Sequence, residues 1–162
     1  MDVIQSRVMD ELPPFMDFEA SGLGPHGYPI QVAWSAPDGA VHECWFITPA
    51  GAHGWAVDEG WDPAAARVHG ISLTTVYEHG RPAEWIAARL NAQLAGQTVY
   101  VDGGACDQVW CRQLFTAAAV TPQFVLGDYW ELLLSRLPPS RTVFRPQRRK
   151  GQAQTMWLRR RL

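Results

Sequence analysis

Two carboxylates stand two residues apart in the apolar segment Phe15-Met16-Asp17-Phe18-Glu19, and this pair could do chemistry. On a β-strand, residues i and i+2 point to the same face, so Asp17 and Glu19 would lie side by side. Two like charges at that separation repel each other unless a cation lies between them. Hard divalent cations prefer carboxylate oxygens, so the spacing predicts a site for Mg²⁺ or Mn²⁺. The alternative is a surface strand with two solvated acids and no metal.

The residues after the two acids add a family resemblance. Ser21-Gly22 would turn the chain sharply just beyond the pair. The string Asp-Phe-Glu-Ala-Ser-Gly-Leu resembles the first motif, Asp-x-Glu, of the DEDD 3′–5′ exonucleases, which include polymerase proofreading subunits and RNase T. The resemblance implies that Asp17 and Glu19 are catalytic metal ligands. It also implies that Gly22 and Leu23 lie beside the 3′-terminal nucleotide, with Leu23 against the base.

A third acid follows the apolar segment 98–101, which predicts a short strand. The run Asp102-Gly103-Gly104-Ala-Cys-Asp107 resembles the second motif of the family, and the resemblance implies that Asp107 is the third catalytic metal ligand. Asp102, at the strand end, is the competing candidate. The alternative role for Asp107 is that of an acid in the first turn of a helix, where the helix dipole favours it. We expect the glycine pair to permit close approach of a substrate backbone.

The third motif is where the chain departs from the family pattern. In the DEDDh branch this motif is His-x₄-Asp, but here no histidine follows Asp107 and no acid follows Glu131. At the matching spacing, Arg149 replaces the general base and Gln154 replaces the carboxylate. Arginine stays protonated at neutral pH and a glutamine side chain is neutral, so this third motif is degenerate. Arg149 could bind a substrate phosphate instead. An altered C-terminus, produced by a frameshift or truncation, is an alternative explanation.

The five histidines of the chain all precede the second motif. His69-Gly70-Ile71-Ser72 resembles the His-Gly-Ile-Thr segment of the family, which does not contain the catalytic histidine. A helix end with an exposed imidazole is a sufficient explanation for His69. Among the other histidines, His26 follows the first motif closely enough to enter the same cleft.

Charge is distributed unevenly along the 162 residues. All 16 acids and 6 of the 14 Lys+Arg lie at or before Ser140, and the other 8 basic residues lie in the last 22 positions. A basic segment beside an acidic metal site could bind a polyanionic nucleic-acid strand. Two alternatives explain the pattern equally well: the basic tail neutralises the acidic body, or it is a frayed terminus. Three cysteines and no signal peptide favour a reducing cytoplasm, and no apolar run is long enough to span a membrane.

Apolar patterning predicts an α/β fold. Strands are expected at 15–19, 28–35 and 41–48, forming an antiparallel meander, and further short strands at 97–101 and 124–126. A turn is expected at 37–39 and a loop at 49–62. Helices are expected at 62–70, 72–77, 81–94, 105–119 and 128–137, with helix-compatible residues at 150–161. Asp62 and Ser72 are expected as N-caps, Gly70 as the end of the first helix, and Trp85 on the apolar stripe of 81–94. This order resembles the ribonuclease H-like fold, a five-stranded mixed sheet flanked by helices. We interpret residues 1–12 as a lead-in and 13–162 as a single exonuclease-like domain.

The resemblance implies a 3′–5′ exonuclease that hydrolyses terminal phosphodiesters of single-stranded DNA or RNA with a divalent metal. Because the His-x₄-Asp motif is missing, we expect impaired activity. The alternative is a catalytically inactive nucleic-acid-binding or interaction module on the same fold. Many members of the superfamily are homodimers, so a homodimer is a further open alternative.

Overall fold

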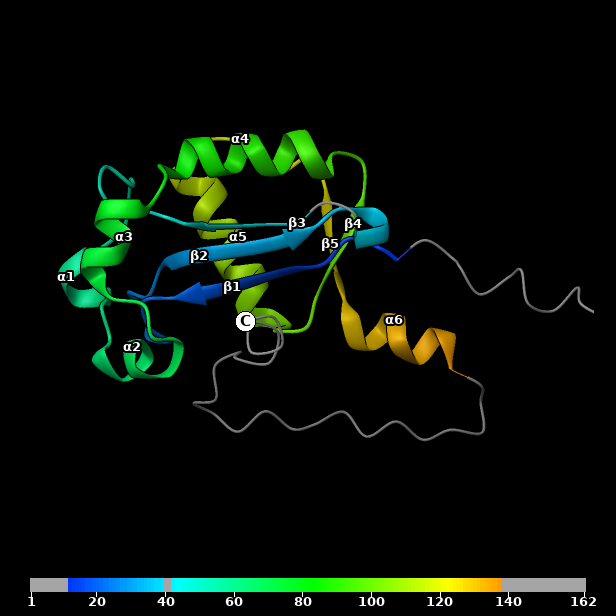
Figure 1. The fold of residues 1–162 in the computed structure, drawn as a ribbon, viewed down its shortest axis with the longest axis horizontal. Helices are drawn as coiled ribbons and strands as arrows, with labels where there is room; N and C mark the ends of the chain where they lie inside the picture. Colours follow the sequence, from blue (N-terminus) through cyan, green and yellow to red (C-terminus); the bar gives the residue numbers. More distant parts are fainter. Residues whose placement is uncertain (1–11, 40–41, 138–162) are drawn as a thin grey trace, which may run out of the picture.

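Three antiparallel strands form the first sheet of the computed structural model, which describes residues 12–39 and 42–137 (Figure 1). The order is β1 (Met16–Ala20), β2 (Pro29–Ser35) and β3 (His42–Phe46). The register pairs Asp17 with Ala33 and Ala33 with Cys44. A one-turn 3₁₀ helix, η2 (Pro37–Gly39), lies between β2 and β3, where the sequence predicts a turn. The predicted meander is therefore confirmed.

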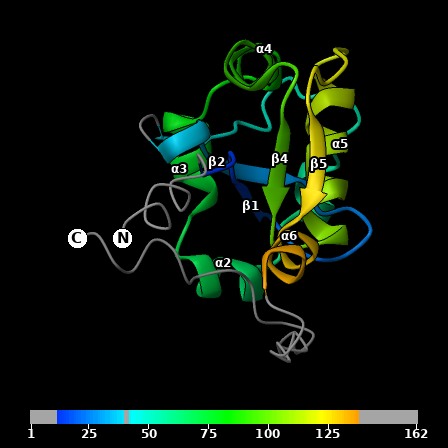
Figure 2. The same cartoon turned by 90° about the vertical axis from the view of Figure 1, so that its right-hand side faces the viewer.

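Two parallel strands, β4 (Thr98–Val101) and β5 (Val125–Asp128), form the second sheet (Figure 2). A single parallel bridge between Phe15 and Tyr100 joins it to β1, and Tyr100 N donates to the Pro14 carbonyl at 2.9 Å. The mixed α/β class is confirmed. The predicted five-stranded sheet instead takes the form of three antiparallel and two parallel strands, because only this short contact connects β1 to β4.

Helices occupy the connections between the strands. Their bounds are α1 (Val57–Gly60), α2 (Pro63–His69), α3 (Leu73–His79), α4 (Ala83–Leu94), α5 (Ala105–Ala117) and α6 (Tyr129–Arg136). The predicted caps are present: Asp62 accepts from Ala64 N, Ser72 accepts from Thr75 N, and Gly70 ends α2 with φ 76°. The sequence did not predict α1, which lies in a segment interpreted as loop. The helix expected at 150–161 lies outside the described residues.

The core lies between one face of the first sheet and helices α4 and α5, which cover that face in Figure 1. Alternate strand residues such as Phe18 and Val32 are buried against Leu90 and Leu114. Trp85 was expected on the apolar stripe of α4, but 40% of it is exposed, because it packs at the rim of the core against Trp45. Among the described residues, no helix is long and apolar enough to cross a membrane.

Candidate metal centre

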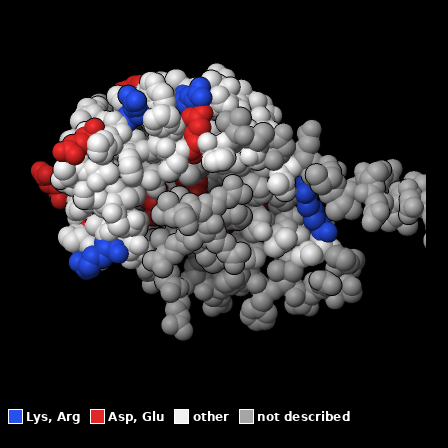
Figure 3. Space-filling model, viewed as in Figure 1, with Lys and Arg blue, Asp and Glu red and all other residues white. Residues whose placement is uncertain are grey.

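Strand β1 presents Asp17 and Glu19 on the face that α4 and α5 leave uncovered. Their neighbours Met16 and Phe18 point the other way and are 3% and 1% exposed in the core. This alternation is what the spacing of two predicts. The β1–β2 register shifts between Glu19 and Ala20, and such bulges re-aim side chains at strand ends. Acidic side chains are visible at the centre of this face in the space-filling view (Figure 3).

Three aspartates converge at this face from three different elements. Asp17 lies on β1, Asp102 follows β4, and Asp107 lies in the first turn of α5. One carboxylate oxygen of each lies within 4.8 Å of the others. Asp107 is fully buried, and Asp17 and Asp102 are half-buried. The sequence treated Asp102 and Asp107 as competitors for one position, whereas the structure brings both to Asp17.

The Gly103-Gly104 turn determines where the Asp107 carboxylate lies. Gly103 N donates to Asp107 Oδ2 at 2.7 Å, and Gly104 has φ 57° and ψ −123°, a conformation essentially restricted to glycine. A Cβ on Gly103 would lie 2.0 Å from Asp107 Oδ2. Gly103 therefore makes room for the protein's own carboxylate. The approach of a substrate backbone, expected from the sequence, stays a prediction.

Negative charge and burial perturb the groups around the aspartates. Burial, reinforced by the nearby Asp107 carboxylate, raises the pKa of Glu19 to about 7. Burial and then Asp107 raise the pKa of the Cys111 thiol to about 12. Burial and then the charges of Asp17 and Glu19 raise the pKa of Cys44, which lies in register with Asp17 across the sheet. The shifts share one sign, as expected of a concentration of carboxylates in a partly desolvated site.

The donor set suits a hard divalent cation. Carboxylate oxygens are the ligands that Mg²⁺ and Mn²⁺ prefer, and oxygens on opposite sides of a Mg²⁺ lie about 4 Å apart because each bond is about 2.0–2.1 Å. One oxygen of each of the three aspartates lies within 4.8 Å of the others, a spacing close to that value. Glu19, 5% exposed, has no hydrogen bond or ion pair with the described part of the chain, so a cation would compensate its charge. The residues therefore fit the metal.

The loop after β1 carries the two residues to which the resemblance assigns the nucleotide. Leu23 is 60% exposed, as a side chain that contacts a base must be before substrate binds. Gly22 is buried, and a Cβ there would lie 2.9 Å from the Asp62 Cβ. Gly22 thus also has a packing role, because it lets the loop after β1 lie against the segment around Asp62. A hydrogen bond from Asp62 N to the Ser21 carbonyl, at 2.8 Å, joins the two segments.

No histidine belongs to the carboxylate cluster among residues 12–39 and 42–137. His26 lies on the β1–β2 loop with its Nε2 3.7 Å from Glu59 Oε2. His69 ends α2, and its Nδ1 accepts from Ile71 N at 3.0 Å. Burial lowers the pKa of His69, which favours the neutral ring. The two residues at the degenerate third motif, Arg149 and Gln154, lie outside the described residues.

The fold built around this centre is that of the exonuclease I structures. No family model and no curated protein matches the chain. The zinc-bound form of the E. coli exonuclease I–ssDNA complex aligns with a TM-score of 0.59 and 18% identity over 75% of this chain. Exonuclease I from Methylocaldum szegediense aligns with a TM-score of 0.58 and 20% identity over 74%. E. coli exonuclease I in complex with a dA16 oligonucleotide aligns with a TM-score of 0.59 and 18% identity over 74% of this chain.

In each of these three structures the matched region is 28% of the neighbour's chain. The chain thus spans under a third of the length of the exonuclease I proteins that it resembles. Identities of this size establish a shared fold, an exonuclease-type mixed α/β domain, and leave the chemistry to be argued from the residues of this chain.

Proposed function

We propose that the chain is a metal-dependent 3′–5′ exonuclease-like protein that acts on the terminal phosphodiester of single-stranded DNA or RNA. The observation that carries the proposal is the convergence of Asp17, Asp102 and Asp107 on one face of an exonuclease-type fold. The bound oligonucleotides of the structural neighbours support single-stranded nucleic acid as the ligand class. A bound Mg²⁺ or Mn²⁺ would polarise the scissile phosphate and lower the pKa of a water molecule.

The chain's own residues then have separate roles. Asp17, Glu19 and Asp107 would hold the ion, and the Gly103 amide keeps the Asp107 carboxylate in place. Leu23, on the exposed loop after β1, contacts the terminal base. Since no described histidine adjoins the carboxylates, general-base catalysis is weak, and its loss costs roughly 10²–10⁴-fold in rate. We therefore propose turnover that is slow.

The decisive test is digestion of a 5′-labelled single-stranded oligonucleotide, as DNA and as RNA, with Mg²⁺ or Mn²⁺. The expected result is a ladder that shortens from the 3′ end and disappears with EDTA and in Asp17→Asn. Asp58→Asn, an exposed acid on α1, is the matched control and should leave the ladder unchanged. Wild-type protein that leaves both oligonucleotides intact, yet binds them with an affinity that EDTA does not alter, would favour the inactive nucleic-acid-binding module instead.

A further inference from the structure

The carboxylate count of the centre does not depend on the C-terminal segment. The family pattern places its fourth carboxylate in the third motif, but this chain has Gln154 there and no acid at all after Glu131. A metal site built from the first two motifs alone would hold three carboxylates. Asp102 adds a fourth, from a position directly after β4 that lies outside the three ligands implied by the resemblance.

Strand register explains why Asp102 reaches the centre. The parallel bridge pairs Phe15 with Tyr100, so the residues two positions later on each strand, Asp17 and Asp102, lie side by side. Neighbouring strands are about 4.8 Å apart, and residues i and i+2 share a face. The separation of the carboxylate oxygens, within 4.8 Å, agrees with this register. The placement of Asp102 is therefore set by the backbone.

A second observation indicates that the cluster is built for a cation. Glu19 lies on the same face and is 5% exposed, and no hydrogen bond or ion pair joins it to residues 12–39 or 42–137. A buried carboxylate is costly unless it is paired or coordinates a metal. Asp107, fully buried, lies close enough to Glu19 for its charge to raise the pKa of Glu19, so Glu19 borders the cluster of the three aspartates.

We propose that Asp102 is a metal ligand that takes the place of the third-motif carboxylate, so that the ion is held entirely by residues 17–107. The inference rests on the proposed function and deepens it. The degenerate third motif then removes the general base but leaves the carboxylate count at four. Gln154 is dispensable for metal binding, whereas Asp102 is required.

The test is a Mn²⁺ titration of the full chain, with free Mn²⁺ measured by electron paramagnetic resonance. Four variants are compared with the wild type: Asp17→Asn, Asp102→Asn, Gln154→Ala and the exposed control Asp58→Asn. Each is first checked for its melting temperature in EDTA, and Asp102→Ser serves as the second variant if Asp102→Asn is poorly folded. Even outer-shell residues typically contribute 10–100-fold to metal affinity, so loss of a direct ligand should weaken binding by at least about 10-fold.

The expected result is weaker Mn²⁺ binding in Asp17→Asn and Asp102→Asn, with Gln154→Ala and Asp58→Asn close to wild type. Wild-type affinity in Asp102→Asn together with loss in Asp17→Asn would overturn the role of Asp102 and leave the metal site intact. An equal loss of Mn²⁺ affinity in Gln154→Ala would overturn the claim that residues 17–107 suffice to hold the ion. Absence of Mn²⁺ binding by the wild type would refute the metal site itself, and with it the proposed function.

Discussion

Gly103 and Asp107 are in such close contact that the backbone of one positions the carboxylate of the other. The Gly103 amide donates to Asp107 Oδ2 at 2.7 Å, and any Cβ at position 103 would overlap that oxygen. A hydrogen bond to an ionised carboxylate is shorter and roughly twice as strong as one between neutral groups. The contact thus fixes one proposed metal ligand through the backbone of the chain.

Gly103→Ala should displace the Asp107 carboxylate and weaken metal binding. Loss of a hydrogen bond to a charged group costs about 1.5–3 kcal/mol, so the melting temperature should also fall. The measurement is the Mn²⁺-induced shift in Tm, which should shrink in this variant. Gly24→Ala is the matched control, because a Cβ there meets nothing within 4 Å. An unchanged Mn²⁺ shift in Gly103→Ala would contradict the positioning role.

Glu19 should make the metal-free protein less stable as the pH rises. Its pKa is about 7 in the folded state against 4.5 as a reference value, so between these pH values the native state holds a proton that the unfolded chain has lost. Stability then decreases with rising pH across that window and is level on either side of it. A shift of this size corresponds to on the order of 3 kcal/mol.

The check is thermal unfolding in EDTA from pH 4 to pH 8 for wild type and Glu19→Gln. The variant should match the wild type near pH 4 and be more stable near pH 8, because its neutral amide avoids the buried charge. Saturating Mn²⁺ should reverse this order at pH 8, since the metal compensates the carboxylate. Parallel pH profiles for the two proteins would show that Glu19 is not the titrating group.

The sequence predicts the local structure well wherever short-range chemistry decides it. Alternation predicted β1 to β3, and the caps at Asp62, Ser72 and Gly70 predicted the bounds of α2 and α3. Trp85 was misplaced because periodicity identifies the apolar face of a helix but not its rim.

The candidate site could be predicted only in part. The i, i+2 spacing of Asp17 and Glu19 is a local signal, and both share a face as expected. The role of Asp102 depends on the pairing of Phe15 with Tyr100, a long-range register that periodicity does not encode. Its position at the carboxyl end of a buried strand was the available signal, but the sequence offered no way to show that it and Asp107 meet.

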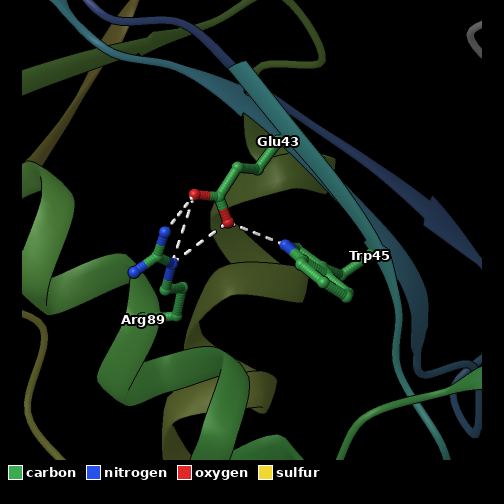
Figure 4. A network of polar contacts seen from close by, with 3 residues as sticks. All are labelled: Glu43, Trp45 and Arg89. Atoms are coloured by element: carbon green, nitrogen blue, oxygen red, sulfur yellow. Dashed lines mark hydrogen bonds and ion pairs between the residues drawn. The ribbon is translucent and has the colours of Figure 1, made fainter. Parts of the chain in front are cut away.

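A network of polar contacts joins β3 to α4 through Glu43, Trp45 and Arg89 (Figure 4). Arg89 Nε donates to both oxygens of Glu43 at 3.1 and 3.2 Å, and Trp45 Nε1 donates to Glu43 Oε2 at 2.8 Å. The hydrogen bond from Arg89 is the main cause that lowers the pKa of Glu43. Since the Glu43 side chain is 14% exposed, removal of its partner leaves a poorly solvated charge.

Arg89→Ala should therefore destabilise the fold more than Arg67→Ala, a matched change at an exposed arginine near the end of α2. This loss of folding stability should be present at neutral pH and vanish as the pH falls through the lowered pKa of Glu43, where the carboxyl becomes neutral. Urea unfolding at two pH values measures both effects. A double-mutant cycle with Glu43→Gln should show coupling between the two positions. Additive losses would mean that the contact contributes nothing to stability.

Leu23 should affect substrate affinity and leave the metal centre intact. Its side chain is 60% exposed on the loop after β1, so substitution removes little packing in the free protein. Burying a leucine side chain against a base would contribute about 1.5–3 kcal/mol, so Leu23→Ser should raise KM for a single-stranded oligonucleotide by roughly 10-fold or more. Leu134→Ser, a change at a leucine on α6 that is 52% exposed, is the control. Mn²⁺ affinity should stay at the wild-type value in both variants, and an unchanged KM in Leu23→Ser would remove Leu23 from the substrate site.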